Sequence, residues 1–333
     1  MEVRREKLAA AAPTKRSGSC YRPTIMKIGI TGATGFLGKA LVQRLVARGD
    51  ELVIFSRNGA RASQTLGIPA ITADLESPGE WQKSLAGLDV LVHLAGESIA
   101  AKRWDARQKQ VLRDSRVEAT RVIVEGIAAL PAEQRPKALI SASGADYYAF
   151  ASGPGDFDDD EVDEKAPAGD HFLGRLCRDW EAQAFAAEPL GLRVVAMRTG
   201  IVLGEGGGAL DKMATAFKFF VGGPIGSGRQ WFSWLHRDDA IGAYLFAIDT
   251  PSLHGPVNLV APNAVRQKQF AKALGHAMHR PSFMPVPGFA LRAAVGSEFA
   301  EYLLEGRRVV PKALERAGYK FIKPTIDAAL AAL

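Results

Sequence analysis

A glycine-rich turn between a short apolar strand and an amphipathic helix constrains the fold of this chain more than any other feature. Residues 27–30 (KIGI) are strand-like and lead into the turn TGATGFLG at residues 31–38. Residues 39–49 have the apolar spacing of a helix that ends at Gly49, and residues 51–55 form a second strand-like run. The order strand, glycine turn, helix, strand predicts the first unit of a parallel, doubly wound α/β sheet.

The three glycines of the turn have separate tasks in a dinucleotide-binding site. Gly32 permits the tight turn, Gly35 lets the backbone approach a pyrophosphate, and Gly38 lets the helix pack closely on the strand. The N-terminus of the helix adds free N–H groups and a positive dipole end. The spacing Gly-x-x-Gly-x-x-Gly resembles that of the extended short-chain dehydrogenase/reductase family, which includes sugar-nucleotide epimerases and dehydratases.

The end of the second strand indicates which nicotinamide cofactor is used. An acidic residue at this point accepts hydrogen bonds from the 2′-OH of NAD, whereas an arginine accommodates the 2′-phosphate of NADP. This chain has Ser56 and Arg57 there and no acid. A hydroxyl and a guanidinium suit a phosphate, so we expect NADP(H) rather than NAD(H), and this placement argues against Arg57 as a merely solvated charge.

Two further strands extend the same site. Residues 71–75 are strand-like and contain Asp74, which can accept a hydrogen bond from the adenine amino group; the alternative is an acid in a surface turn. Residues 90–96 form a buried strand that ends in small residues, which lets the backbone come close to the cofactor's ribose. Within it, we interpret His93 as a satisfied buried histidine rather than as a catalytic base.

Later segments continue the alternation and predict the whole architecture. A long helical stretch covers residues 104–130, a fifth strand residues 139–143 and a sixth residues 193–204. The fold class is therefore α/β, a Rossmann doubly wound, mainly parallel sheet with a small substrate-side α/β region at the C-terminus. The predicted division is a disordered extension at 1–25, an NADP-binding core at 26–204, and a mainly substrate-side region at 205–333 from which some segments return to the core.

Several short sequence motifs, found in a fixed order along the chain, indicate one branch of the family. They are LAGESI (94–99), RW (103–104), DSR (114–116), SAS with YY (141–148), RTGIVLG (198–204), GGPIGSG (222–228) and WLHRDD (234–239). The set resembles the atypical "epimerase family" proteins of the extended short-chain superfamily, over roughly residues 26–330. Together with the Rossmann turn, this resemblance implies the following cofactor-binding residues: Gly32, Thr34, Gly35, Phe36, Leu37, Gly38, Ser56, Arg57, Asp74, Leu94, Ala95, Gly96, Arg116, Gly200, Ile201 and Val202.

The catalytic machinery of the superfamily is only partly present. It consists of a serine, and of a tyrosine and a lysine four residues apart on one helix, where the ammonium lowers the pKa of the phenol. Ser143 stands at the serine position. On the helix over residues 172–181, however, Leu173 and Cys177 take the tyrosine and lysine positions.

Three residues could replace part of the missing tyrosine–lysine machinery. Tyr147 and Tyr148 follow the fifth strand and are the predicted proton donors, with pocket lining or packing as the alternative role. Arg116 replaces an asparagine usual in the family and can contact the cofactor's phosphate or nicotinamide ribose, unless it is an ordinary surface arginine. Cys177 as a nucleophile is disfavoured because no histidine stands at a readable partner position.

Composition excludes several other functions. The net charge is +6, but residues 1–25 carry +4 and the other 308 residues only +2. We therefore expect no nucleic-acid and no membrane partner. Two cysteines far apart exclude a disulfide scaffold and a zinc cluster, predict no metal, and favour a reducing, cytoplasmic location. An organelle transit peptide is the alternative for residues 1–25, although Glu2 and Glu6 argue against it.

Two functional hypotheses follow from these features. The first is an NADP(H)-dependent oxidoreductase or epimerase-like enzyme that acts on an unidentified small polar substrate, as a monomer or homodimer, with Ser143 orienting the substrate. The second is a non-catalytic NADP(H)-binding sensor or regulatory protein, which the residues at positions 173 and 177 motivate.

Overall fold

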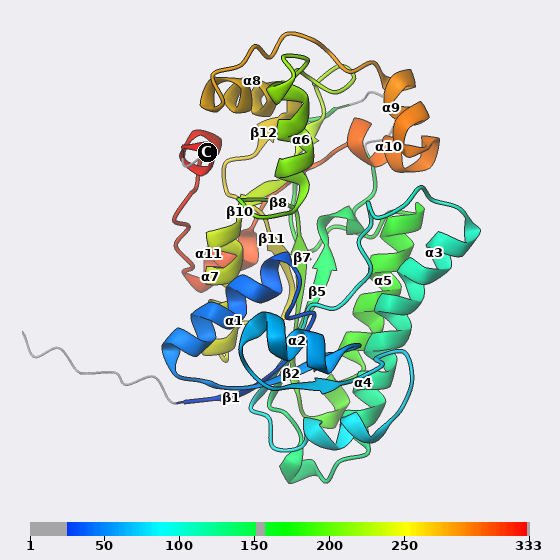
Figure 1. Ribbon diagram of the computed structural model, residues 1–333, viewed down its shortest axis with the longest axis vertical. Coiled ribbons are helices and arrows are strands. Elements are labelled where there is room, and N and C mark those ends of the chain that lie inside the picture. The colour runs from blue at the N-terminus through cyan, green and yellow to red at the C-terminus, as the bar shows by residue number, and fades with distance from the viewer. Residues whose placement is uncertain (1–24, 151–156, 332–333) are drawn as a thin grey trace, which may run out of the picture.

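A seven-stranded parallel sheet forms the centre of the protein in a computed structural model, which describes residues 25–150 and 157–331 (Figure 1). Its strands are β1 (Lys27–Thr31), β2 (Glu51–Ser56), β3 (Ala70–Thr72), β4 (Val90–His93), β5 (Ala138–Gly144), β7 (Arg193–Thr199) and β11 (Gly255–Leu259). Their order in the sheet is β11-β7-β5-β4-β1-β2-β3. The strands β2 and β3 are added on one side of β1 and the strands β4, β5, β7 and β11 on the other, so the strand order reverses between β1 and β4. Ligands of doubly wound sheets bind at such a switch point. The predicted fold class is confirmed.

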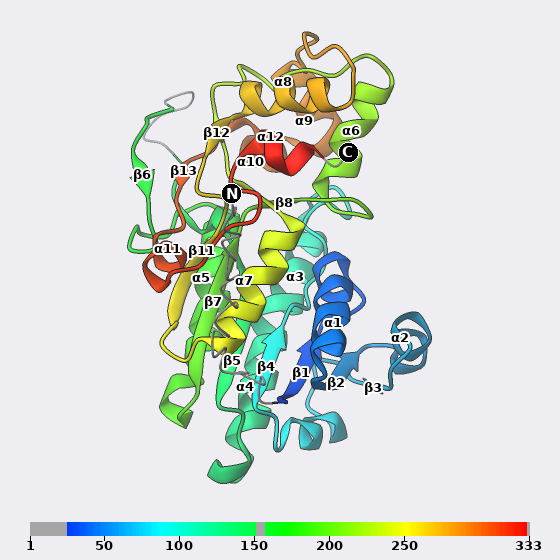
Figure 2. The ribbon, with the colours of Figure 1, turned by 90° about the vertical axis from the view of Figure 1, so that its left-hand side faces the viewer.

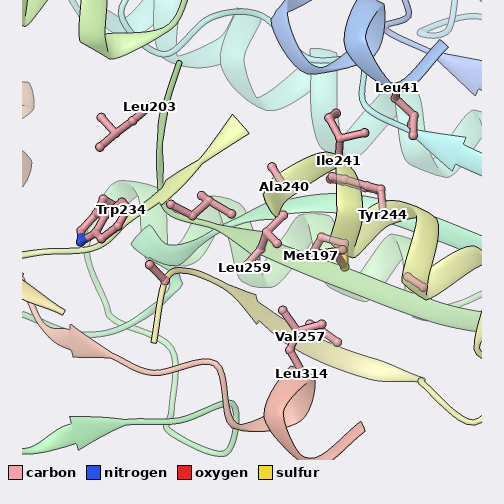
Figure 3. Close-up of a cluster of buried hydrophobic side chains, with 14 of the residues drawn as sticks. Leu41, Met197, Leu203, Trp234, Ala240, Ile241, Tyr244, Val257, Leu259 and Leu314 are labelled. Carbon is pink, nitrogen blue, oxygen red and sulfur yellow. The ribbon is translucent and has the colours of Figure 1, made fainter. Parts of the chain in front are cut away.

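Helices cover both faces of this sheet. On one face lie α1 (Phe36–Arg48) and α7 (Arg237–Asp249), whose apolar side chains form one cluster with β1, β5 and β7. Figure 3 shows part of this cluster, where Ile241 and Tyr244 of α7 lie between Leu41 of α1 and Met197 of β7. On the other face, a second cluster joins the sheet to η1 (Glu80–Leu85), α4 (Ala119–Ala128) and α5 (Phe172–Phe185).

The first helix shows how the local sequence determines its bounds. Gly49 ends α1 in the left-handed region with a φ of 92°, as predicted from its position. The start differs, since α1 begins at Phe36 and not at residue 39. Gly35 is the extended N-cap with φ −74° and ψ 178°, so the helix already contains the third glycine of the turn. The first turn of α1 therefore lies directly against the glycine turn.

The last third of the chain adds a lobe and also returns to the sheet. The lobe contains α6 (Ala209–Lys218), α8 (Gln267–Ala277), α9 (Gly288–Val295) and α10 (Ser297–Leu304), which gather at the top of Figure 1. Two short strand pairs join the last third to earlier segments: β8 (Ile201–Leu203) with β10 (Trp234–His236), and β6 (Glu161–Val162) with β13 (Arg308–Val309). A third pair, β9 (Trp231–Phe232) with β12 (Val265–Arg266), lies within the last third itself. Both α7 and β11 follow residue 204 and pack in the core (Figure 2).

The remaining elements are short connections and terminal helices. They are α2 (Gly59–Leu66), α3 (Ala106–Arg113), η2 (Asp114–Glu118), η3 (Ala132–Gln134), η4 (Ala145–Tyr147), η5 (Glu188–Leu190), α11 (Lys312–Ala317) and α12 (Ile326–Leu330). No helix within the described ranges is long and apolar enough to cross a membrane. The predicted extension at 1–25 lies outside the described residues except for Ile25.

Candidate functional site

Two adjoining cavities meet at the glycine turn. The inner cavity has a volume of about 500 Å³ and runs from Gly32 and Gly38 past Ser143 to Tyr302 and Arg307 of the C-terminal lobe. The outer cavity, also about 500 Å³, runs from Gly32 past Arg57 to Asp74. Both are lined by Gly35 and by the residues that follow β4. Together they form one elongated site along the carboxyl ends of the strands, where a dinucleotide binds in this fold.

The geometry of the glycine turn fits a pyrophosphate. Gly32 has a φ of +71°, and a Cβ there would lie 2.7 Å from the backbone N of Ala95. A Cβ on Gly38 would collide with the carbonyl oxygen of Gly32. A Cβ on Gly35 would meet only that same oxygen, at 3.2 Å, so this glycine is otherwise open. Since α1 has neither a side-chain cap nor an acidic residue in its first turn, its free N–H groups suit an anion.

Three cationic side chains line the outer cavity, one from α1 and two from the segment that follows β2. Ser56 and Arg57 line it, as do Lys39 and Arg61, which sequence reasoning missed. Arg61 stands four residues after Arg57 in the first turn of α2, which Asn58 caps by accepting a hydrogen bond from the Arg61 backbone N–H at 2.9 Å. The available signal was a second arginine close in sequence to Arg57, at the start of the helix that follows β2. Asp74 also lines the outer cavity, beyond the end of β3.

The other predicted cofactor residues divide between the two cavities. Phe36, Leu37, Arg116, Gly200 and Ile201 line the inner cavity, Thr34 lines the outer one, and Leu94, Ala95 and Gly96 line both. Val202 lies in β8 and is not among the lining residues of either cavity. The glycine turn, the end of β4 and the exit from β7 are thus brought together as the motifs predicted, while contact with Val202 stays a prediction.

Arg116 points inward because the helix that carries it changes its winding. The helix expected over residues 104–130 is interrupted by a π-helical turn, η2 (Asp114–Glu118). Arg116 is 8% exposed, so the alternative of a surface arginine is wrong. Its guanidinium donates to the carbonyl oxygens of Glu97 at 2.8 Å and Leu112 at 3.2 Å and lies 5.4 Å from the Trp180 ring. Burial lowers the pKa of this guanidinium, yet it stays a cation beside the inner cavity.

A buried network holds Ser143 at the end of β5. The Ser143 hydroxyl donates to Glu181 Oε1 at 2.7 Å. Arg198 donates from Nε and Nη2 to the two oxygens of the same carboxylate, at 2.8 and 2.7 Å. All three residues are 5% exposed or less. Because the Ser143 O–H donates its hydrogen bond to Glu181, the lone pairs of the Ser143 oxygen can accept a hydrogen bond from a ligand in the inner cavity.

The two candidate phenols both contact Arg198. The Tyr148 hydroxyl accepts from Arg198 Nη1 at 2.9 Å and donates to Asn258 Oδ1 at 2.5 Å. Burial raises the pKa of Tyr148 to about 12. The Tyr147 ring centroid lies 3.4 Å from the guanidinium carbon of Arg198, and Tyr147 is not among the residues lining the inner cavity. Tyr148, by contrast, lines the inner cavity. The contacts thus indicate packing for Tyr147 and a pocket-lining position for Tyr148, and proton donation by either phenol stays a prediction.

The helix positions of the missing pair face the inner cavity. Leu173 and Cys177 both line it and are 2% and 5% exposed. Burial raises the pKa of the Cys177 thiol to about 12, so the thiol stays neutral. Asp146, which sequence reasoning missed, lines the same cavity from η4. Its signal was a carboxylate three residues after Ser143, just beyond the carboxyl end of a central strand.

His93 is the satisfied buried histidine that was predicted. It is fully buried, and its Nδ1 lies 2.6 Å from the Thr31 hydroxyl and its Nε2 3.1 Å from the Thr120 hydroxyl. Thr120 donates its own proton to the Arg116 carbonyl, so Nε2–H is the donor to Thr120 and Nδ1 accepts from Thr31. Burial lowers the pKa of His93 to about 4, which keeps the ring neutral.

An acidic run follows β5, from Asp156 to Glu164 in the sequence, and several of its acids form ion pairs. Asp159 pairs with Arg266, and Glu161 lies 3.4 Å from Arg308 and 3.2 Å from Lys312. These pairs join the run to the C-terminal third of the chain. Among the described residues there is no cluster of three or more His, Cys, Asp or Glu suited to a metal ion. Asp156, the first acid of the run, lies outside the described residues.

Comparison with known proteins identifies the family of this chain. Residues 28–259 match the NAD dependent epimerase/dehydratase family, and residues 286–333 match a domain of unknown function, DUF1731. The chloroplastic Epimerase family protein SDR39U1 homolog of Arabidopsis thaliana is 39% identical over 95% of this chain and 88% of its own length. Epimerase family protein ML0860 of Mycobacterium leprae is 40% identical over 91% of this chain and 94% of its own.

A solved structure is similar as well. The crystal structure of human epimerase family protein SDR39U1 (isoform 2) with NADPH superposes with a TM-score of 0.78 at 34% identity, over 92% of this chain and 98% of that chain. The similarity spans both the sheet and the C-terminal lobe. This chain belongs to the NAD dependent epimerase/dehydratase family, as an atypical epimerase family protein of the extended short-chain dehydrogenase/reductase type.

Proposed function

We propose that this protein binds NADP(H) along the two cavities. The glycine turn and the N-terminus of α1 would hold the pyrophosphate, and Ser56, Arg57 and Arg61 would hold the 2′-phosphate in the outer cavity. Two observations support this choice. β2 ends in a serine followed by an arginine, with no acid for a free 2′-OH. The similar human protein was crystallised with NADPH.

We further propose that the protein is an oxidoreductase or epimerase-like enzyme acting on a small polar substrate. The observation that carries this proposal is the continuity of the inner cavity, which extends from the glycine turn past Ser143 to residues of the C-terminal lobe. The cofactor supplies or receives a hydride when bound. Ser143, fixed by Glu181, orients the substrate through its free lone pairs. Tyr147 and Tyr148 both contact Arg198, and Tyr148 also lines the inner cavity, so proton donation by one of these phenols stays a prediction.

A second candidate is a non-catalytic NADP(H)-binding sensor or regulatory protein. Leu173 and Cys177 favour it, because an aliphatic side chain and a neutral thiol replace the phenol and the ammonium of the superfamily. The two candidates differ in one measurable property, which is turnover of the cofactor. The cytoplasmic location, the monomeric or homodimeric state and the division into residues 26–204 and 205–333 stay predictions.

Oxidation of NADPH in the presence of a panel of aldehydes and ketones tests the enzyme proposal. We expect turnover with at least one polar carbonyl compound. Loss of one oriented hydrogen bond in Ser143→Ala should lower kcat/KM about 2- to 12-fold, since such a bond contributes about 0.5–1.5 kcal/mol. The dissociation constant of NADPH should not change. Ser252→Ala, at an exposed serine, is the matched control. Equal kcat/KM in Ser143→Ala and wild type would contradict the role of Ser143.

A further inference from the structure

We propose that Asp146 is the residue that exchanges a proton with the substrate, in place of the phenol that is missing at position 173. The inference rests on the proposed enzymatic function and names the acid–base group that this function needs.

The carboxyl group of Asp146 lies on the same side of the inner cavity as the missing pair. Asp146 belongs to η4 (Ala145–Tyr147), directly after β5, and lines the cavity together with Ser143. A Cβ placed on Gly144 would lie 3.6 Å from Asp146 Oδ2 and 3.3 Å from Cys177 Sγ. The carboxyl group therefore approaches position 177, one helical turn from Leu173, from the strand side and not from α5.

The neighbouring charged groups Glu181 and Arg116 already form hydrogen bonds within the protein, whereas the carboxyl group of Asp146 is available to a ligand. Glu181 accepts from Ser143 and from two nitrogens of Arg198, and Arg116 donates to two backbone carbonyls. Within residues 25–150 and 157–331, the carboxyl group of Asp146 forms no salt bridge and no hydrogen bond to another side chain. Its own backbone N–H is its hydrogen-bond partner. A carboxyl group left in this way inside a cavity is available to a substrate.

The surroundings of Asp146 shift its pKa toward the range that suits a general acid or base. Burial raises the pKa of Asp146 to about 6, and its backbone N–H and the Arg116 charge oppose the rise only in part. The other titratable groups that face it are Cys177 of α5 and Tyr302 of α10, and burial raises the pKa of both. Both stay neutral and Arg116 stays charged near pH 6–7, so Asp146 alone among these four changes its protonation state there. A general acid or base works best near its own pKa.

The proton step is the following, in the direction of carbonyl reduction. The O–H bond of the Asp146 carboxyl group breaks, and a new O–H bond forms on the substrate oxygen while the carbonyl carbon receives the hydride. The C=O double bond becomes a single bond, and the resulting carboxylate regains a proton from water. In the oxidising direction the carboxylate takes the proton from the alcohol. Both directions need only the nicotinamide cofactor and a carbonyl or alcohol substrate.

Two measurements on Asp146→Asn, with the exposed Asp211→Asn as control, test the proposal. The first is a pH titration of aspartate carboxyl ¹³C signals in the intact protein. We expect one signal with a midpoint near pH 6 that is absent from Asp146→Asn and present in Asp211→Asn. The second is carbonyl reduction by NADPH. We expect kcat to fall about 100-fold or more in Asp146→Asn, with an unchanged dissociation constant for NADPH.

The pH profile separates a catalytic role from a structural one. Wild-type kcat for reduction should fall as pH rises above about 6, because the acid must be protonated, and this limb should vanish in Asp146→Asn. Wild-type kcat in Asp146→Asn, or no carboxyl signal with a midpoint between pH 5 and 7, would overturn the role of Asp146 while the proposed function stands. If wild type binds NADPH but reduces no carbonyl compound, the proposed function fails and this inference fails with it.

Discussion

Replacing Arg198 with leucine should lower the free energy of unfolding by about 3–5 kcal/mol, because it leaves the buried carboxylate of Glu181 without its cation. Arg198 is 3% exposed and Glu181 5%, and two hydrogen bonds of 2.8 and 2.7 Å join them. The change also removes the donor to the Tyr148 hydroxyl. Urea denaturation followed by circular dichroism measures the loss.

The double variant Arg198→Leu, Glu181→Leu separates an unpaired charge from lost packing. Replacing both partners of a buried ion pair by apolar residues is often neutral or stabilising, so the double variant should regain most of the lost stability. The exposed pair Arg113–Asp179 has an N–O distance of 2.7 Å and side chains 45% and 33% exposed. Arg113→Leu should cost less than about 1 kcal/mol. A double variant no more stable than Arg198→Leu alone would contradict this explanation.

Arg57→Ala should weaken NADPH binding by about 10–100-fold, because a hydrogen bond between two charged groups contributes about 1.5–3 kcal/mol. Affinity for NADH should change little, since NADH has no 2′-phosphate for Arg57 to contact. Wild type should bind NADPH more tightly than NADH, and the variant should lose most of that preference. Isothermal titration calorimetry with both cofactors measures the four dissociation constants.

The control for the cofactor prediction is Arg107→Ala, at an exposed arginine of α3 that lines neither cavity. It removes the same charge from the protein as Arg57→Ala does. If both variants weaken NADPH equally, the effect is one of overall charge and not of a contact. If Arg57→Ala leaves NADPH affinity unchanged and NADH binds as tightly as NADPH, the assignment of NADP(H) is wrong.

Features encoded by short stretches of sequence could be predicted well. The glycine turn, the end of α1 at Gly49 and the serine and arginine after β2 depend on residues within a few positions of one another. Backbone freedom at glycine and the periodicity of apolar residues control these features, and both can be read locally. The parallel sheet then follows from the alternation of strands and helices. Family resemblance added the positions of Ser143 and of the residues after β4 and β7.

The interior of the site could not be predicted in the same way. The bonds from Ser143 to Glu181 and from Glu181 to Arg198 join β5, α5 and β7, and no spacing in the sequence indicates that these side chains meet. The inward turn of Arg116 depends on a π-helical turn, which apolar periodicity does not distinguish from a regular helix. Asp146 could not be singled out from the sequence, because its raised pKa comes from burial beside residues distant in sequence, Cys177 of α5 and Tyr302 of α10.

The central claim is that this chain transfers a hydride between NADP(H) and a small polar molecule bound in the inner cavity. Incubation of the protein with NADPH deuterated at C4 of the nicotinamide and a panel of polar aldehydes and ketones, followed by mass spectrometry of the products, tests this claim most directly. Each face of the nicotinamide is labelled in turn, because either hydrogen can be the one transferred. We predict an alcohol product that carries one deuterium from one of the two labelled cofactors. Tight NADPH binding without a deuterated product from either cofactor would contradict the claim and favour the non-catalytic sensor.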